Sequence, residues 1–291
     1  MDILTQLNRA MAYIEEHIAD DLALADVSAV TMYSPYHFGR LFYYIADMPL
    51  SEYIRKRKLS LAAMQLQSGG DRIIDLAVMY GYDSADSFTR AFAKQHGVTP
   101  SAARRTGVNL TIFPPLTFQI KIKGVQAMNW RIEEKEAFEV FGIERIFKND
   151  ENGRVPGLWD ESFANGEYER LYQAAGAKKG EDGKHCINAV CGYCESGDDS
   201  FPYMLYALKK PDSDTTGFRV AQIPKTTWAV FRSGATKHMG TEILEMYNRA
   251  YSEWLPSSGF DKAVGPDMEV YYDAPDGKYF QEVWIPVIKS T

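Results

Sequence analysis

Apolar residues near the start of the chain recur at helical spacing on either side of a turn. A short apolar face over 24–29 is followed by residues 38–45, which keep the i, i+3, i+4, i+7 pattern of a helix with one buried stripe. Between the two, Ser34-Pro35 is typical of a helix start, because serine caps the first turn and proline fits the first helical position. The pattern predicts two short helices joined by a turn, the second of them over 34–46.

The same pattern returns about fifty residues later. In both copies an aspartate opens the first helix, a tyrosine marks the turn, and an arginine follows a core phenylalanine by two residues. The matching residues are Asp26 and Asp75, Tyr33 and Tyr82, Phe38 and Phe88, Arg40 and Arg90, Phe42 and Phe92, and Pro49 and Pro100. Such a period, built from helical patterns, indicates one supersecondary unit used twice.

The second copy has its own helix boundaries. Gly81 stands where a left-handed C-cap residue is expected. Asp83 or Ser84 then caps a second helix, predicted over 84–95. Between the two copies, residues 49–67 form one predicted helix. Roughly twenty helical residues span about 30 Å, close to the ~34 Å between successive major-groove faces of DNA.

Two helices joined by a tight turn match the DNA-binding helix-turn-helix, whose second helix enters the major groove. An ordinary helical bundle is the alternative, since helix pairs are common. The duplication, with Arg40 and Arg90 at equivalent positions, favours DNA binding, because arginine makes bidentate contacts with guanine. The sequence therefore predicts an all-α domain with tandem helix-turn-helix units over 1–107.

After a proline-containing linker over 108–116, the pattern changes to alternating strands. Strands are predicted near 117–123, 137–147, 186–194, 202–209, 218–223, 227–233, 268–273 and 279–287, and helices near 157–175 and 239–255. A strand, a helix and two strands over 137–209 recur over 227–287. We therefore predict an α+β domain over 117–291 with two pseudo-symmetric halves, whose junction can form a small-molecule pocket.

The last predicted strand places a carboxylate between two aromatic rings. Phe280, Glu282 and Trp284 share one face by the period of two. A buried carboxylate is costly unless a positive group pairs with it. That group is either a cationic ligand, which the rings also attract by cation–π contact, or simply a nearby lysine or arginine.

Composition indicates a protein of ordinary soluble type, with 45% hydrophobic and 24% charged residues. The chain shows no apolar run near the roughly 18 residues that span a bilayer, and its start lacks the features of a secretory signal. Its three cysteines make no disulfide framework. A cytoplasmic location without membrane association is therefore expected.

His185, Cys186, Cys191 and Cys194 invite a metal interpretation. Positions 191 and 194 point to opposite faces of a strand, which is poor geometry for one ion. Buried structural cysteines explain the group better, so no metal is expected. The chain also shows no nucleophile elbow, zinc signature or phosphate-binding glycine loop, so no cofactor and no enzymatic activity are expected.

Positive charge is concentrated in one stretch although the net charge is −7. Residues 48–110 hold nine basic against five acidic residues, whereas 1–47 hold two against seven. A local basic face can bind phosphate on an acidic protein, because charges beyond about 8–10 Å are screened. The run Arg55-Lys56-Arg57-Lys58 is the densest part; its alternative role is a solvated helix face.

Two longer motifs resemble a known family. The run Leu50-Ser51-Glu52-Tyr53-Ile54-Arg55-Lys56-Arg57-Lys58-Leu59, and the spaced pattern from Ile74 through Gly81-Tyr82, Phe88, Arg90 and Phe92 to Thr99-Pro100, are similar to the AraC/XylS signature over residues 4–106. The resemblance implies that 34–46 and 84–95 are recognition helices. It places the first of these helices in one major groove of DNA, with Tyr36, Gly39 and Arg40 facing the bases. The second helix lies in the next major groove, with Ala85, Asp86, Thr89 and Arg90 facing the bases.

The expected DNA contacts follow from that placement and from the basic residues. They are Tyr36, His37, Arg40, Arg55, Arg57, Ser84, Asp86, Thr89, Arg90 and Lys94. Gly39 offers no side chain, and Ala85 offers only an apolar contact, so the second helix is expected to read DNA mainly through Arg90. A structural role for His37, partly buried, is the alternative to a phosphate contact.

The second domain resembles the GyrI-like effector-binding domains over roughly 118–289, and the whole resembles the Rob-type architecture. The resemblance rests on Glu282-Val283-Trp284-Ile285-Pro286, Trp159-Asp160-Glu161 and Phe141-Gly142. It implies that Glu282 faces a central pocket that receives lipophilic cations in multidrug-sensing members. The candidate ligand-binding residues are Glu282, Trp159, Trp228, Tyr271, Phe280 and Trp284. A place in the hydrophobic core is the alternative for Trp159, Trp228, Tyr271 and Trp284.

The sequence thus predicts a transcription regulator that binds double-stranded promoter DNA and a small-molecule effector, with RNA polymerase as a further partner. Two alternatives stay open. The second domain is a small hydrolase-like enzyme fused to a DNA reader, with Glu282 and a tyrosine as acid and base, or it binds a protein and no ligand. The effector, the operator, the sign of regulation and the oligomeric state do not follow from the sequence.

Overall fold

The computed structural model describes residues 3–31, 33–118, 127–148, 155, 157–176, 187–194 and 200–290. Contacts divide the chain into two compact units. The first comprises residues 3–35 and 48–119, and the second comprises residues 36–47 and 120–291. The predicted domain limits along the sequence, 107 and 117, stay a prediction, whereas residues 36–47 pack with the second unit.

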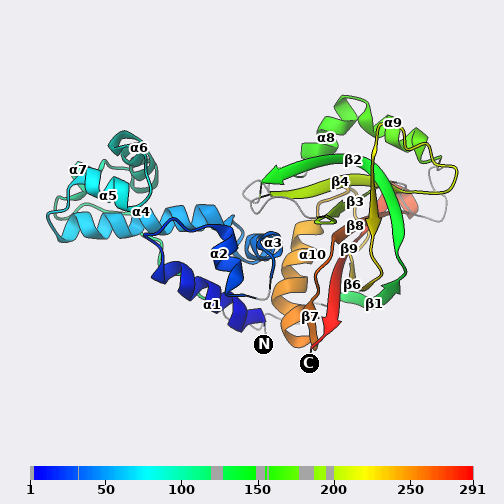
Figure 1. The fold of residues 1–291 in the computed structure, drawn as a ribbon, viewed down its shortest axis with the longest axis horizontal. Coiled ribbons are helices and arrows are strands. Elements are labelled where there is room, and N and C mark those ends of the chain that lie inside the picture. Colours follow the sequence, from blue (N-terminus) through cyan, green and yellow to red (C-terminus); the bar gives the residue numbers. More distant parts are fainter. Residues whose placement is uncertain are drawn as a thin grey trace. The chain divides into compact units, whose positions relative to one another are not determined.

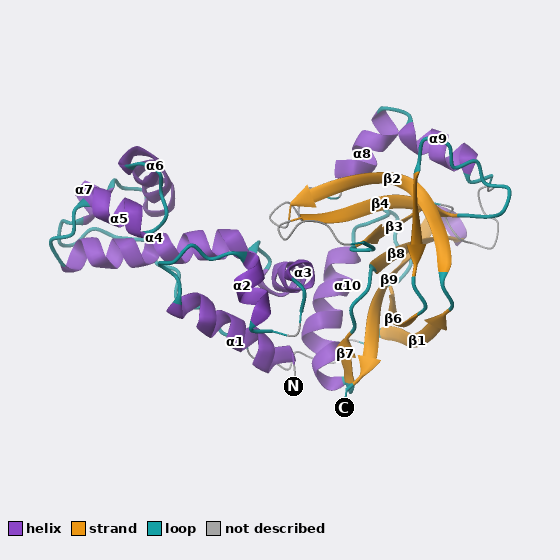
Figure 2. Cartoon of the chain, in the orientation of Figure 1, coloured by secondary structure: helices purple, strands orange, loops and turns teal. Residues whose placement is uncertain are grey.

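The first unit is built of helices (Figures 1 and 2). They are α1 Ile3–Glu16, α2 Leu24–Ala29, α4 Leu50–Ser68, α5 Ile73–Met79, α6 Ala85–His96 and α7 Pro100–Ala103. Helix α3, Pro35–Ala46, follows α2 in the chain and belongs almost wholly to the second unit. Both predicted recognition helices and the long helix between the two copies are therefore present, each within two residues of its predicted bounds.

The second helix-turn-helix packs against the C-terminal half of α4. Its core consists of the buried side chains of Leu59, Ala62, Ala63, Leu66, Leu76, Ala77, Tyr80, Phe88, Phe92 and Ala103. Gly81, with φ of 79°, makes the turn between α5 and α6, a left-handed conformation that favours glycine. The side chain of Ser84 accepts a hydrogen bond from the backbone N–H of Ser87 and so caps α6 as predicted.

The second unit contains one antiparallel sheet. Its strands are β1 Asn129–Lys135, β2 Phe138–Lys148, β3 Asn188–Cys191, β4 Ser200–Leu208, β5 Arg219–Ile223, β6 Thr226–Arg232, β7 Phe260–Lys262, β8 Asp267–Ala274 and β9 Lys278–Lys289. The described strands follow the order β1-β6-β9-β8-β3-β4-β2-β5, with β7 pairing with β9. Within this order β6-β9-β8 mirrors β2-β4-β3 about the β8/β3 pair, so the two predicted pseudo-symmetric halves are confirmed.

Besides α3, the described α-helices of this unit are α8 Gly157–Ala164, α9 Glu167–Ala174 and α10 Ile243–Arg249. The single helix predicted over 157–175 is broken at Gly166, where φ is 80°. Helix α10 continues into a π-helical turn over Ala250–Trp254. Strands β1 and β7 were not predicted, and of the strand predicted over 117–123 the described residues, 117 and 118, lie outside any strand.

The sheet is buried on both faces, and the two faces carry different side chains. Helices α8 and α9 cover one face of the sheet (Figure 1). Their Leu158 and Leu171 belong to a core with residues of β2, β3 and β4. The other face carries a second core around Trp228 and Trp284. Because side chains alternate along a strand, each residue of β8 or β9 belongs to one face only. No described helix is long and apolar enough to cross a membrane.

Candidate DNA interface and effector pocket

Helix α6 offers a polar face to solvent. Asp86, Arg90 and Lys94 are exposed and follow each other at intervals of four residues, so they form one stripe along the helix. Phe88 and Phe92 on the opposite side are completely buried. The fold of the second helix-turn-helix therefore fixes the orientation of α6 and leaves its basic stripe accessible, with Thr89 half-buried at its edge.

The basic run on α4 is largely occupied by contacts within the first unit. Arg57 is buried, and it donates to the carboxylate of Glu15 at 2.6 and 2.9 Å and to the carbonyl of Phe113. These bonds raise the pKa of the Arg57 guanidinium. Arg55 pairs with Glu52 on the next turn of its own helix, at 2.6 Å. Arg57 thus joins α1, α4 and the segment after α7 and has no accessible surface to offer DNA.

Helix α3 turns its predicted groove-facing side toward the sheet of the second unit. Arg40 is only 2% exposed. Its Nη1 donates to the Sγ of Cys191 at 2.5 Å and to the hydroxyl of Tyr36 at 3.2 Å, and its Nε lies 3.6 Å from Oδ2 of Asp267. The guanidinium also lies 5.1 Å from the ring centre of Tyr44, within cation–π range. In this arrangement Arg40 is unavailable to DNA.

His37 is buried beside Arg40. Its Nε2 donates to the carbonyl oxygen of Gly265 at 2.9 Å. Burial, together with the charge of Lys262, lowers the pKa of His37 to about 4. In this arrangement His37 has the structural role that the sequence left open as an alternative to a phosphate contact.

A pocket of about 190 Å³ lies on the face of the sheet that α8 covers. Strand β8 contributes Glu269 and Tyr271, β4 contributes Tyr203, and α8 contributes Trp159. The remaining walls are Tyr43 and Tyr44 of α3, Val155, and Gly240, Ile243 and Leu244 at the start of α10. The lining is thus mainly aromatic, with one carboxylate.

Glu269 gives this pocket its electrostatic character. The side chain is 7% exposed, and Oε2 accepts hydrogen bonds from the hydroxyls of Tyr203 at 3.0 Å and Tyr271 at 2.9 Å. Among the described residues no lysine, arginine or histidine forms an ion pair with it. Burial raises the pKa of Glu269 above its usual value of 4.5, since the charged form loses solvation. The charge of Arg40 opposes this rise in pKa without cancelling it, so a cation in the pocket would stabilise the charged form further.

Of the six predicted ligand-binding residues, Trp159 and Tyr271 line this pocket. Glu282 does not line it. On β9, Glu282 pairs in register with Val270, a neighbour of Glu269 on β8. Because neighbouring residues alternate faces, Glu282 lies on the opposite face of the sheet. Trp228 and Trp284 are buried in the core of that opposite face, and Phe280 shares their side by the period of two.

The carboxylate of Glu282 is neutralised within the protein. Arg131 of β1 donates to both of its oxygens, at 2.7 and 3.1 Å. The hydroxyl of Tyr272 and the indole N–H of Trp284 donate to Oε2 at 2.9 and 3.0 Å. The salt bridge that the sequence left open as the alternative to a ligand is therefore present. Sequence reasoning missed Arg131 because β1 itself was not predicted.

Glu269 carried a usable signal in the sequence. In the strand Asp267-Met268-Glu269-Val270-Tyr271 a carboxylate stands two residues before a tyrosine, the same period-two argument that singled out Glu282. Tyr203 and the two tyrosines of α3 could not be assigned to the pocket from the sequence, because they come from elements distant in the chain.

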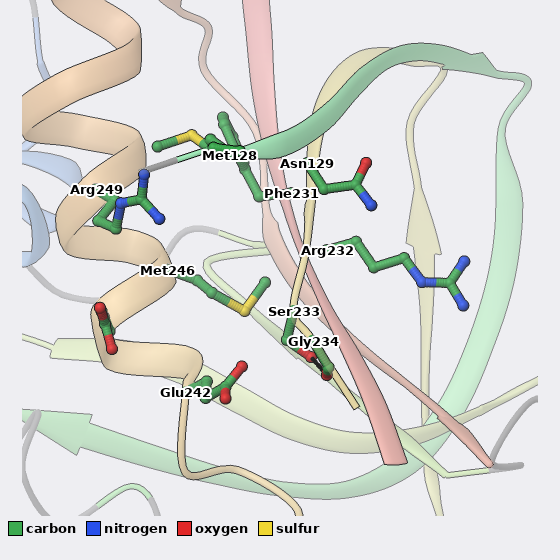
Figure 3. Close-up of a pocket in the computed structure, with 11 residues that line it drawn as sticks. Met128, Asn129, Phe231, Arg232, Ser233, Gly234, Glu242, Met246 and Arg249 are labelled. Carbon is green, nitrogen blue, oxygen red and sulfur yellow. Dashed lines mark hydrogen bonds between the residues drawn. The ribbon is translucent and has the colours of Figure 1, made fainter. Parts of the chain in front are cut away.

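A second pocket, of about 340 Å³, lies between α10 and the β1/β6 edge of the sheet (Figure 3). Met128, Phe231 and Met246 give it an apolar side. Its charged groups, which include Glu242 and Arg249, are only partly buried. This pocket therefore has neither the buried charge nor the aromatic lining of the first.

The cysteine group predicted not to bind metal is only partly described. His185 and Cys186 lie outside the described residues. Cys191 is buried against Arg40, and burial raises the pKa of its thiol to about 12, whereas Cys194 is exposed.

Comparison with known proteins identifies both units. Residues 27–106 match a family model described as a helix-turn-helix domain, and residues 131–287 match the integron-associated effector binding protein family. The fold and the pocket thus define a helix-turn-helix DNA-binding regulator with an effector-binding domain. The chain belongs to the AraC-type transcription regulators and carries a GyrI-like effector-binding domain of this integron-associated family.

Several curated bacterial proteins are similar to the N-terminal part of this chain. The transcriptional activator AarP of Providencia stuartii is 36% identical over 105 residues, which are 35% of this chain and 78% of AarP. The regulatory protein SoxS of Escherichia coli is 37% identical over 94 residues, 32% of this chain and 88% of SoxS. The right origin-binding protein of Escherichia coli is 36% identical over 106 residues, 36% of this chain and only 37% of that relative.

Among solved structures, SAV2435 bound to tetraphenylphosphonium is 16% identical. The match covers 55% of this chain and 94% of SAV2435, with a TM-score of 0.45.

Proposed function

We propose that this regulator senses a small organic cation in the Glu269 pocket and reads promoter DNA through the exposed stripe of α6. RNA polymerase is its further partner on the promoter. The relatives are transcription regulators, and we assign no catalytic step to the chain. The observation that carries the effector proposal is Glu269 itself, a nearly buried carboxylate without an ion-pair partner among the described residues, in an accessible aromatic pocket.

The burial of this carboxylate has an energetic cost. Burial disfavours the ionised form of Glu269, and the nearby charge of Arg40 offsets this cost only in part, since the pKa of Glu269 stays raised. A cation reduces the cost further, and the rings of Trp159, Tyr43 and Tyr44 add cation–π attraction of about 0.5–2 kcal/mol each. Arg131 already neutralises the carboxylate of Glu282, so a cationic ligand would gain less binding energy there.

A matched pair of probes tests the proposal. Benzyltrimethylammonium carries a permanent charge that does not titrate, and neopentylbenzene has the same shape with carbon in place of the charged nitrogen. Titrations monitored by tryptophan fluorescence are expected to show binding of the cation, with the neutral probe at least tenfold weaker. Glu269→Gln keeps the size of the side chain and should abolish this preference. Equal affinity for the two probes in the wild-type protein would contradict the proposal.

DNA binding is tested on a duplex that the full chain selects from a random-sequence pool. We expect the selected duplex to bind at least a hundredfold more tightly than an unrelated duplex at the same salt concentration. Equal binding of the two duplexes would show that the chain does not recognise sequence.

A further inference from the structure

The two sides of helix α3 are both buried, and they carry different residues. Phe38, Leu41 and Phe42 form the apolar side. The other side carries Tyr36, which packs against Phe201 with ring centres 5.2 Å apart, and Arg40. This polar side is the one that the AraC-type resemblance places in the major groove.

Polar and aromatic side chains of the second unit surround the guanidinium of Arg40. Asp267 of β8 is 1% exposed and lies 3.6 Å from Nε of Arg40, and Cys191 of β3 accepts from Nη1. The ring of Tyr247 lies 5.2 Å from the guanidinium and stacks on Tyr44, with ring centres 4.5 Å apart. A buried carboxylate flanked by tyrosine rings is a surface that fits an arginine-bearing helix.

The same helix forms part of the effector pocket. Tyr43 and Tyr44 line it, and Tyr44 also accepts a hydrogen bond from Arg40. A cation in the pocket touches these rings only while α3 lies on the sheet. A DNA duplex reaches Arg40 only when α3 has left it.

We propose that the surface around Asp267 is a docking site for α3, and that effector and DNA compete through this helix. The inference rests on the proposed function, since it takes the Glu269 pocket as the effector site. The effector holds the docked state, in which the first recognition helix is hidden. DNA binding by α3 favours the undocked state and lowers the affinity for the effector by the same factor, because the coupling of two binding equilibria is reciprocal.

A substitution of Gly192 tests the docking, because an added methyl group would collide with a side chain of α3. A methyl group there would lie 2.2 Å from Cε1 of Tyr36, and the three atoms nearest to it all belong to Tyr36. Gly192→Ala therefore forces the ring of Tyr36 to move, and we expect it to weaken the contact of α3 with the sheet. Gly176→Ala is the matched control, because Gly176 also has positive φ, 59° against 65°, but an added methyl meets nothing within 4 Å.

The full-length wild type and both variants are titrated with the selected duplex and with benzyltrimethylammonium. Gly192→Ala should bind the duplex about tenfold more tightly and the cation several-fold more weakly, because overpacking shifts the docking equilibrium. Gly176→Ala should match the wild type in both. In the wild type, a saturating concentration of the cation should weaken DNA binding several-fold. A variant that merely fails to fold would lose both activities, so the opposite signs separate release from damage.

The competition is overturned if the cation binds and leaves the affinity for DNA unchanged, and the docking is overturned if Gly192→Ala and Gly176→Ala bind the duplex equally. Failure of the proposed function has a different signature. If the wild type does not distinguish the cation from neopentylbenzene, the Glu269 pocket is excluded as a cation site. The comparison of the two glycine variants still tests the docking of α3.

Discussion

Arg40 of α3 and Asp267 of β8 form an ion pair with 3.6 Å between Nε and Oδ2, and the two residues are 2% and 1% exposed. Lys262 of β7 completes the cluster, with its Nζ 3.0 Å from Oδ1 of Asp267. Two positive groups thus share one carboxylate out of contact with water. Their charges hold the pKa of Asp267 below its usual value in spite of its burial.

Removing the carboxylate of this cluster should destabilise the second unit. Asp267→Asn leaves Lys262 and Arg40 buried without a counter-charge, which costs about 3–5 kcal/mol. Urea denaturation measures this loss of unfolding free energy. Glu139→Gln is the control, because its partner Lys209, 2.8 Å away, is on the surface and such pairs contribute less than about 1 kcal/mol. Equal losses in the two variants would argue against a buried charge cluster.

Two neighbouring arginines of α4 should behave differently. Arg57→Ala leaves Glu15 partly buried and unpaired, so we expect a loss at the lower end of about 3–5 kcal/mol. Arg55→Ala removes an exposed pair with Glu52 and should cost about 0.5 kcal/mol. Thermal unfolding of both variants measures these two losses of stability. If Arg57→Ala keeps wild-type stability, its contacts with Glu15 and Phe113 do not hold the first unit together.

The stripe of α6 predicts two kinds of DNA contact. Arg90→Ala should cost about 1–3 kcal/mol of binding and relax the sequence preference at one base position. Lys94→Ala should weaken binding to all duplexes alike and lower the salt slope by about one. Measurement of affinity against salt concentration on selected and unrelated duplexes separates these two kinds of contact.

A change of Asp86, at the start of the same stripe, to Asn should improve the affinity for all duplexes, because a negative charge near phosphate is removed. The same measurement of affinity against salt concentration checks this.

Binding of a cation should depend on pH through Glu269. Burial raises the pKa of this carboxyl above 4.5, so the charged form that binds the cation appears only as the pH rises through that raised value. The affinity for benzyltrimethylammonium should rise by up to about tenfold per pH unit below that pKa and level off above it. Glu269→Gln should give a flat profile. A wild-type affinity that is flat from pH 4.5 upward to pH 8 would exclude the titration of this group.

The sequence predicted most of the architecture because its signals were local. Helix α6 begins at a serine cap and follows a glycine turn, both visible in the chain, and the halves of the sheet repeat the same order of elements. Strand β1 was missed because it is an edge strand with most side chains exposed, so it lacks the alternation of a half-buried strand. Gly166 divides the helix predicted over 157–175, a break that periodicity alone did not show.

The site was harder to predict because the sheet is buried on both faces. Glu269 and Glu282 are alike in sequence, because each stands two residues before an aromatic residue on a largely apolar strand. Whether a glutamate lines a pocket depends on the residues that cover its face of the sheet. Arg131 covers Glu282, whereas residues of α3 and α8 form pocket walls around Glu269. In the same way, nothing local in the sequence of α3 shows that Arg40 faces Asp267, more than two hundred residues away.

A comparison of the two carboxylates shows which of them binds the effector. Calorimetric titration of benzyltrimethylammonium into Glu269→Gln and Glu282→Gln is made on samples that near-ultraviolet circular dichroism shows to be folded. We expect Glu269→Gln to lose at least tenfold in affinity and Glu282→Gln to bind like the wild type. Unchanged binding by Glu269→Gln, with loss in Glu282→Gln, would place the effector on the opposite face of the sheet and exclude the Glu269 pocket as its site.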